Sequence, residues 1–179
     1  LVHLMRHIRG TRKLPLTLST NGSGILKWWV DASFAVHPNM RGHSGGGLSM
    51  GRGFPIVGST KQKLNGHSST EIEVIGVDDF MPAICWTRYF LQAQGYAVND
   101  NVLHQDNKSA ILLEENGEKS SGKRTRALDI RCFFLADQDE KGNMQIAHCP
   151  TGEMIADCVA KPLQGEKFQQ FRRSVVGMP

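Results

Sequence analysis

The sequence of 179 residues predicts an α/β domain with a five-stranded mixed sheet, three antiparallel strands followed by two parallel strands, flanked by helices. Two observations carry this prediction. Three short apolar runs separated by glycine-rich turns come first along the chain and indicate an antiparallel meander. Segments with helical spacing then alternate with two further strand-like runs. A membrane protein is excluded, since no apolar run approaches the roughly 18 residues that span a bilayer.

Residues 1–24 are expected to lie outside this domain. Apolar residues at positions 1, 4, 5 and 8 have helical spacing, and Gly10 is expected to end that helix. A polar connection follows over residues 11–24, with a turn at 21–24. The segment is too short for a domain of its own, so we expect it to be the end of a preceding helix in a longer polypeptide.

Three strands are expected to open the domain, which we place at residues 25–163. They cover residues 25–32, residues 48–50 after the glycine-rich stretch 42–47, and residues 54–59. A phosphate-binding loop is the rival interpretation of the stretch 42–47. It fails, because no Gly-Lys-Ser/Thr ending occurs and no long helix follows directly.

A long helix follows, and Ser68 with Glu71 fits a capping box at its start. Apolar residues at positions 72, 75, 83, 86 and 90 share one stripe, and Pro82 predicts a kink or a break. The later expected elements are a strand at 98–105, helices at 108–115 and 125–139, a strand at 144–149, a helix at 152–163, and a helical appendage within 164–179.

The formal net charge is +4, from 21 basic and 17 acidic residues, which permits a polyanionic partner without requiring one. The basic residues are uneven, because they gather within residues 1–13 and 119–126. The four cysteines show no Cys-x-x-Cys spacing, so neither a zinc site nor a disulfide framework is expected, and unpaired thiols point to a reducing compartment.

Four acidic residues stand where predicted elements begin or end. They are Asp31, Glu71, Asp106 and Asp157. Each alone is most simply a turn former, a helix cap or a solvated surface residue. Together they indicate more, because carboxylates that converge from neighbouring strands and a helix need cations to neutralise them. Such oxygen-rich sites suit Mg²⁺ or Mn²⁺, and two such ions activate water against a phosphodiester.

Several motifs, in order along residues 25–163, resemble the ribonuclease H domain of copia-type (Ty1/copia, Pseudoviridae) LTR retrotransposon Pol polyproteins. Residues 1–11 are similar to the tail of the reverse transcriptase domain that precedes it. The motifs are Trp-Val-Asp-Ala-Ser at 29–33, Ser-Thr-Lys-Gln-Lys at 59–63, Ser-Ser-Thr-Glu-Ile-Glu at 68–73, Gln-Asp-Asn-Lys-Ser-Ala at 105–110, the basic segment 123–131, and segments 150–157 and 161–163.

The resemblance implies a ribonuclease H-like fold and a nuclease that cleaves the RNA strand of RNA–DNA hybrids during reverse transcription. It places the metal-binding carboxylates on Asp31, Glu71, Asp106 and Asp157, with two Mg²⁺ or Mn²⁺ ions. Glu73 competes with Glu71 and should point about 200° away from it on a helix. We prefer Glu71, because it follows Ser-Ser-Thr as in the family motif.

The implied partners are the hybrid and the upstream reverse transcriptase domain, with no membrane. The implied location is the cytoplasm, in virus-like particles, or the nucleus. Ser33, Asn107 and the stretch 42–47 are candidates for close approach to the substrate backbone. Phosphate contacts are expected from Lys61, Lys63, Lys108, Lys123, Arg124 and Arg126.

Two alternatives remain open. One is a catalytically inactive nucleic-acid-binding or connection module of the same fold, from a decayed element. The other is an integrase-like strand-transfer domain, although its expected Asp, Asp, Glu order is not met.

Overall fold

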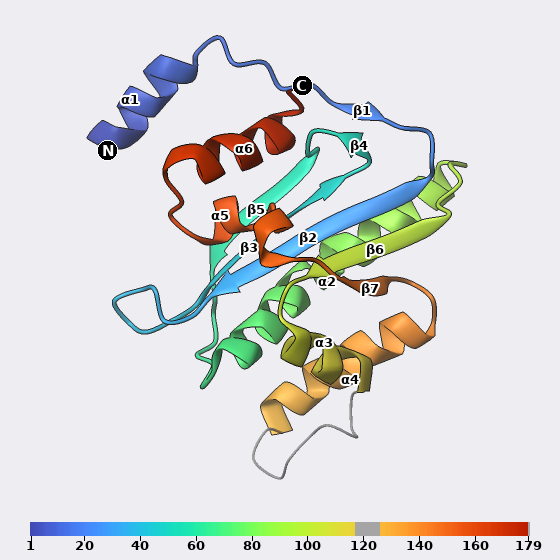
Figure 1. Cartoon of the computed structure of the whole chain (residues 1–179). Helices are drawn as coiled ribbons and strands as arrows, with labels where there is room; N and C mark the ends of the chain where they lie inside the picture. The colour runs from blue at the N-terminus through green and yellow to red at the C-terminus, as the bar shows by residue number, and fades with distance from the viewer. Residues whose placement is uncertain (117–125, 179) are drawn as a thin grey trace.

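A five-stranded mixed sheet forms the centre of the molecule in a computed structural model, which describes residues 1–116 and 126–178 (Figure 1). Its order is β5-β3-β2-β6-β7. β2 pairs antiparallel with β3, and β3 with β5, whereas β6 lies parallel to β2 and β7 parallel to β6. The predicted fold class is therefore confirmed. The strands are β2 (Ile25–Ser33), β3 (His43–Ser49), β5 (Ile56–Lys61), β6 (Asp100–Gln105) and β7 (Gln145–His148).

The two faces of β2 carry different side chains. Leu26, Trp28 and Val30 are buried in the main hydrophobic core. Because side chains alternate along a strand, Trp29 and Asp31 point to the opposite face. Trp29 stands beside His104 of β6 in the sheet register, and their rings stack with centroids 4.8 Å apart. Asp31 therefore lies on the face of β2 opposite the main core.

Helices α2 (Ser69–Ala93), α3 (Lys108–Asn116) and α4 (Arg126–Glu140) lie on the core side of the sheet (Figure 1). The Ser68 side chain accepts a hydrogen bond from the backbone N–H of Glu71 at 3.2 Å, so the predicted N-cap is confirmed. α2 also runs through Pro82 without the break that the sequence suggested. Pro82 is exposed, so its ring enters no packed interface.

The inward stripe of α2 differs from the predicted one. Trp86 and Phe90 are exposed, whereas Val77, Phe80 and Ile84 belong to the core. The prediction holds at the start of the helix, where Ile72 and Ile75 are buried. Further along, the buried positions are 77, 80, 81, 84 and 87 in place of the predicted 83, 86 and 90.

Short elements replace the predicted helix over 152–163. They are η2 (Thr151–Glu153) and α5 (Asp157–Ala160), and α6 (Gly165–Val176) follows on the same side of the sheet (Figure 1). Met154 and Ala156 are buried in a small core with Cys149, which draws the chain inward between the two short elements. Pro162 then disfavours helical backbone at Lys161, which is extended. Phe171 anchors α6, with 2% of its surface exposed.

Residues 1–24 lie on the side of the sheet that carries α6 (Figure 1). α1 (Val2–Thr11) has no buried residue, and β1 (Ser19–Thr20) pairs with β4 (Gly51–Arg52). The backbone N–H of Thr17 donates to the carbonyl of Val176 at 2.8 Å, so the two terminal segments touch. The domain boundaries at residues 24 and 163 stay a prediction. Among the described residues, no helix combines the length and apolar character that crossing a membrane requires.

Candidate functional site

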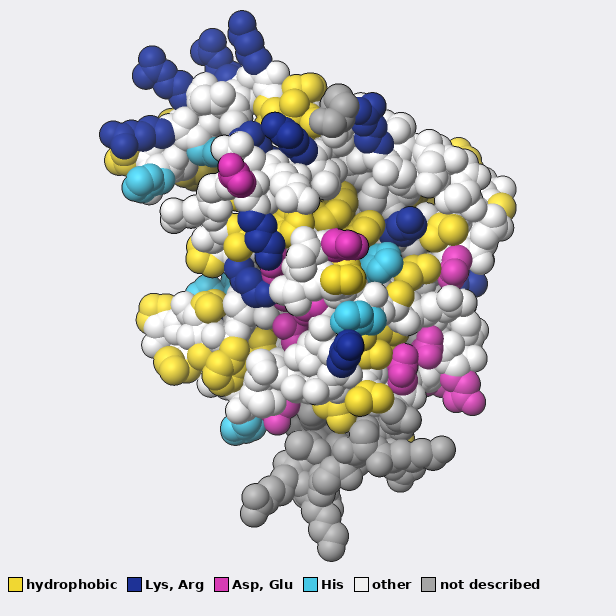
Figure 2. Space-filling view, viewed as in Figure 1, with side chains coloured by type: hydrophobic (Ala, Val, Ile, Leu, Met, Phe, Trp, Pro, Cys, Tyr) yellow, Lys and Arg dark blue, Asp and Glu magenta, His cyan; other side chains and the backbone are white. Residues whose placement is uncertain are grey.

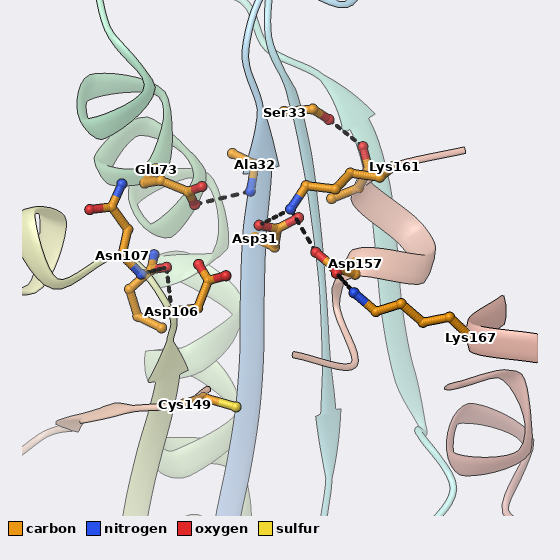
Figure 3. A network of polar contacts seen from close by, with 12 residues as sticks. Asp31, Ala32, Ser33, Glu73, Asp106, Asn107, Cys149, Asp157, Lys161 and Lys167 are labelled. Atoms are coloured by element: carbon orange, nitrogen blue, oxygen red, sulfur yellow. Dashed lines mark hydrogen bonds and ion pairs between the residues drawn. The ribbon is translucent and has the colours of Figure 1, made fainter. Parts of the chain in front are cut away.

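Three carboxylates converge at the end of the central strands. Asp31 comes from β2, Glu73 from the second turn of α2, and Asp106 directly follows β6. One oxygen of each lies within 4.8 Å of the others, a grouping able to hold a metal ion. We call these three residues the carboxylate cluster. Figure 3 shows Asp31 between Glu73 and Asp106 on one side and Asp157 on the other.

Hydrogen bonds from backbone N–H groups hold Glu73 and the turn of Asp106 in place. Glu73 Oε2 accepts the backbone N–H of Ala32 at 3.0 Å, which ties α2 to β2 beside Asp31. The side-chain oxygen of Gln105 accepts the backbone N–H groups of Asp106 at 2.8 Å and Asn107 at 3.2 Å. Gln105 is itself fully buried, so it holds the turn that presents Asp106. The cluster is therefore set by well-packed elements, which favours a preorganised site.

Burial makes this cluster costly to ionise. Asp31 is fully buried and Glu73 is 6% exposed. Burial raises the pKa of Asp31 to about 7, although Lys161 opposes the shift. Burial, with the neighbouring charges of Asp31 and Asp106, raises the pKa of Glu73 to about 9. Asp31 Oδ2 is buried and has no hydrogen-bond partner among the described residues. An all-oxygen donor set with an unsatisfied carboxylate oxygen fits a divalent cation such as Mg²⁺ or Mn²⁺.

Asp157 is linked to Asp31 by the side chain of Lys161. Lys161 Nζ lies 3.0 Å from Asp31 Oδ1 and 2.6 Å from Asp157 Oδ1, so one ammonium bridges the two carboxylates (Figure 3). Lys167 Nζ, from α6, lies 2.5 Å from Asp157 Oδ2. Burial alone would raise the pKa of Asp157, but the hydrogen bonds from both lysines lower it. Asp157 is therefore held as an anion on the far side of Asp31.

Close packing of α5 on β3 makes this bridge possible. A Cβ at Gly45 would stand 2.4 Å from the backbone nitrogen of Ala160, so a larger residue would push α5 away. The hydroxyl groups of Ser33 and Ser59 donate to the carbonyls of Ala160 and Val159. Gly45 pairs with Asp31 in the sheet, and α5 is thus fixed above that residue. Gly45, within the stretch 42–47 proposed for substrate approach, is therefore covered by α5.

The structure reverses the predicted choice between Glu71 and Glu73. Glu71 Oε2 accepts the backbone N–H of His67 at 2.7 Å, which places its carboxylate at the start of α2 and outside the cluster. Glu73 lies on the inward stripe of the helix and reaches Ala32. The two glutamates do point apart as expected, but the helix is rotated so that the second one faces the sheet.

The expected substrate-binding residues have different surroundings. Ser33 is buried and donates to Ala160, so its hydroxyl is used within the fold. Asn107 Oδ1 accepts the backbone N–H groups of Ser109 and Ala110 and caps α3. Lys61 and Lys108 are exposed. Lys61 ends β5 and Lys108 begins α3, both at the end of the sheet that carries the carboxylate cluster. Lys123 and Arg124 lie outside the described residues.

Two site residues were not foreseen, Lys161 and Lys167. Lys161 stands four residues after Asp157, a spacing that pairs opposite charges on a helix, and this signal was available in the sequence. Lys167 belongs to the segment expected to be an appendage, and only the fold of α6 brings it to Asp157. In the space-filling view, acidic side chains reach the surface in the middle of this face beside lysine or arginine side chains (Figure 2).

The chain is similar in sequence to retrotransposon polyproteins. The chain is 28% identical over 177 residues to the retrovirus-related Pol polyprotein from transposon RE2 of Arabidopsis thaliana, covering 98% of this chain and 12% of that protein. It is 28% identical over 142 residues to the Ty1-JR2 Gag-Pol polyprotein of Saccharomyces cerevisiae, covering 78% of this chain and 8% of that protein. The chain thus spans a small part of the curated relatives it matches. No family model matches it.

Comparison with solved structures identifies the fold. The ribonuclease H1 named LC11-RNase H1, isolated from compost, superposes with a TM-score of 0.53 at 12% sequence identity. The match covers 75% of this chain and 91% of that one. The five-stranded sheet with its flanking helices is therefore a ribonuclease H fold.

Proposed function

The sequence likeness and the fold together fit a ribonuclease H domain of a copia-type Pol polyprotein, and from this premise we propose a metal-dependent endonuclease. It hydrolyses the RNA strand of RNA–DNA hybrids during reverse transcription of a retrotransposon. The observation that carries the proposal is the convergence of Asp31, Glu73 and Asp106 within 4.8 Å. The reverse transcriptase domain of the same polyprotein is its proposed partner, and virus-like particles in the cytoplasm are its proposed location.

The cluster residues would hold Mg²⁺ or Mn²⁺ through their carboxylate oxygens. When bound, such an ion lowers the pKa of water and neutralises charge on the phosphodiester. The fold holds the three carboxylates in position. The N–H of Ala32 holds Glu73, Gln105 holds the turn of Asp106, and strand pairing with Gly45 holds Asp31. These contacts keep three carboxyl groups together, two of them buried and that of Asp106 half-buried.

Recognition of a hybrid requires contacts to 2′-hydroxyl groups and to phosphates. Asn107 directly follows Asp106, and its Nδ2 has no hydrogen-bond partner among the described residues, so it is the proposed donor to the RNA strand. The exposed ammonium groups of Lys61 and Lys108 are the proposed phosphate contacts. Lys123 and Arg124 keep the same predicted role from the sequence.

Cleavage of a labelled RNA–DNA hybrid, with RNA–RNA and DNA–DNA duplexes as comparison substrates, tests the proposal. We expect Mg²⁺-dependent cleavage of the RNA strand alone, and its loss in Asp106→Asn. Asp100→Asn is the matched control, because Asp100 begins the same strand at the opposite end. Equal cleavage by the wild-type protein and Asp106→Asn would overturn the enzyme proposal. Binding of the hybrid without cleavage by the wild-type protein would favour a binding module.

A further inference from the structure

Lys161 occupies the space between two of the four acids. Its Nζ lies 3.0 Å from Asp31 Oδ1 and 2.6 Å from Asp157 Oδ1. Asp31 is fully buried and Asp157 is 2% exposed, whereas the side chain of Lys161 is 35% exposed, so the lysine reaches from the surface to two buried carboxylates. The two carboxylate oxygens of Asp31 therefore have different surroundings. One is bound to Lys161, and the other is buried without a partner among the described residues.

We propose that Lys161 is a positioning residue that supplies the positive charge between Asp31 and Asp157, so that the protein binds one divalent cation, at the carboxylate cluster. This inference rests on the proposed function, because it takes Asp31, Glu73 and Asp106 as the ligands of that cation. It replaces the expectation of two ions. A second ion shared by Asp31 and Asp157 would meet the ammonium that already binds both carboxylates.

The charges of the site support a single ion. When ionised, Asp31, Glu73, Asp106 and Asp157 carry four negative charges, and Lys161 and Lys167 carry two positive charges. The remaining two negative charges match one divalent cation. Two divalent cations would leave an excess of two positive charges beside Asp31, Glu73 and Asp157, which are buried, and charge imbalance is costly there.

The position of Lys161 is built into the fold. Its backbone N–H donates to the carbonyl of Asp157 at 2.9 Å, which closes the last turn of α5. The contacts of Ser33 and Ser59 with the carbonyls of Ala160 and Val159 hold this end of α5 on the sheet. Lys161 is thus the residue that follows a clamped turn, and its ammonium has carboxylates on both sides. Lys167 lacks this arrangement, since Asp157 is the one carboxylate that it contacts among the described residues, and its ammonium otherwise lies over the ring of Phe171.

The experiment counts ions without measuring activity. The 179-residue protein is titrated with Mn²⁺, and the free ion is followed by electron paramagnetic resonance. We expect one bound Mn²⁺ per wild-type chain and two per chain for Lys161→Met, because the bridging charge is gone. Lys161→Arg keeps the charge and should bind one. Lys167→Met is the matched control and should also bind one, because the charge between Asp31 and Asp157 remains.

The outcomes separate the two proposals. Two Mn²⁺ per wild-type chain would overturn the inference about Lys161 and leave the proposed function intact. One Mn²⁺ in both the wild-type protein and a folded Lys161→Met, verified by circular dichroism, would also overturn it. No Mn²⁺ bound to the wild-type protein would overturn both. The wild-type count tests the inference even where Lys161→Met fails to fold.

Discussion

Buried carboxylates occur in two regions of this molecule, and their surroundings differ. The carboxylate cluster gathers Asp31, Glu73 and Asp106 from three elements at one end of the sheet. Glu114 stands alone in α3. It is fully buried, and neither of its carboxylate oxygens has a hydrogen-bond partner among the described residues. Burial, with the nearby charge of Glu115, raises the pKa of Glu114 to about 8.

The difference shows that burial does not by itself mark a functional acid. The pKa values of Glu73 and Glu114 are both raised mainly by burial. Glu73, however, accepts the N–H of Ala32 and meets two other carboxylates, which together offer a place for a cation. Glu114 forms no such group among the described residues, and we expect its burial to lower stability. Convergence of several carboxylates therefore identifies the site.

The largest expected effect concerns the two glutamates at the start of α2. Glu73→Gln should reduce hybrid cleavage by about a thousandfold, equivalent to roughly 4 kcal/mol of transition-state stabilisation, because it removes a charged member of the cluster. Glu71→Gln is the matched control and should lose less than about threefold in rate. Single-turnover cleavage rates measure both. A greater loss in Glu71→Gln would restore the choice made from the sequence.

That pair of residues also shows where sequence reasoning ended. The fold class and the positions of Asp31 and Asp106 follow from short apolar runs that end in acidic residues. The second strand does not, because β3 covers residues 43–49 and so includes most of the glycine-rich stretch that was expected to precede it. The choice of glutamate needed the rotation of α2 about its axis. Residues 72 to 77 of that helix are all buried, so apolar spacing could not tell which of the two glutamates faces Asp31.

The link between Lys161 and Asp157 is a second feature that the sequence did not predict. Helical spacing predicted one helix over residues 152–163, but burial of Met154 divides it into η2 and α5. Asp157 was expected as a direct metal ligand together with Asp31. Its link to Asp31 through an ammonium depends on how α5 packs at Gly45, a long-range contact that no local pattern encodes.

Removing Glu114 should stabilise the protein. The folded protein holds this carboxyl protonated up to a pH of about 8, whereas the unfolded chain releases the proton near pH 4.5. Stability is therefore lost as pH rises from about 4.5 through about 8. Glu114→Leu should raise the free energy of unfolding by about 3 kcal/mol at pH 7 and flatten its pH dependence in this window.

Urea unfolding at several pH values measures this effect. Glu115→Gln is the control, because Glu115 is exposed and its substitution should change stability by less than about 0.5 kcal/mol. Glu114→Leu should leave hybrid cleavage unchanged. A loss of cleavage in this variant would join Glu114 to the functional acids and break the comparison.

Mg²⁺ should stabilise the protein by binding at the carboxylate cluster and not at Glu114. At a concentration about 100 times its Kd, the ion should raise the free energy of unfolding by about 2.7 kcal/mol. The gain should disappear in Glu73→Gln and persist in Glu114→Leu. It should also grow between pH 6 and pH 9, because the ion competes with the proton that the raised pKa of Glu73 retains. A gain that survives Glu73→Gln would place the ion elsewhere.

The smallest expected effect concerns the surface that meets the substrate. Lys61→Glu and Lys108→Glu should each reduce the dependence of hybrid affinity on salt, by about 0.9 in the slope of log K against log salt for each lost phosphate contact. Lys141→Glu is the matched control, because Lys141 follows α4 on the core side of the sheet and pairs with Asp137. Fluorescence anisotropy of a labelled hybrid measures the slopes. An equal change in all three variants would mean that the basic residues act through net charge, whereas a change in the first two alone would confine the hybrid to the end of the sheet that carries the carboxylate cluster.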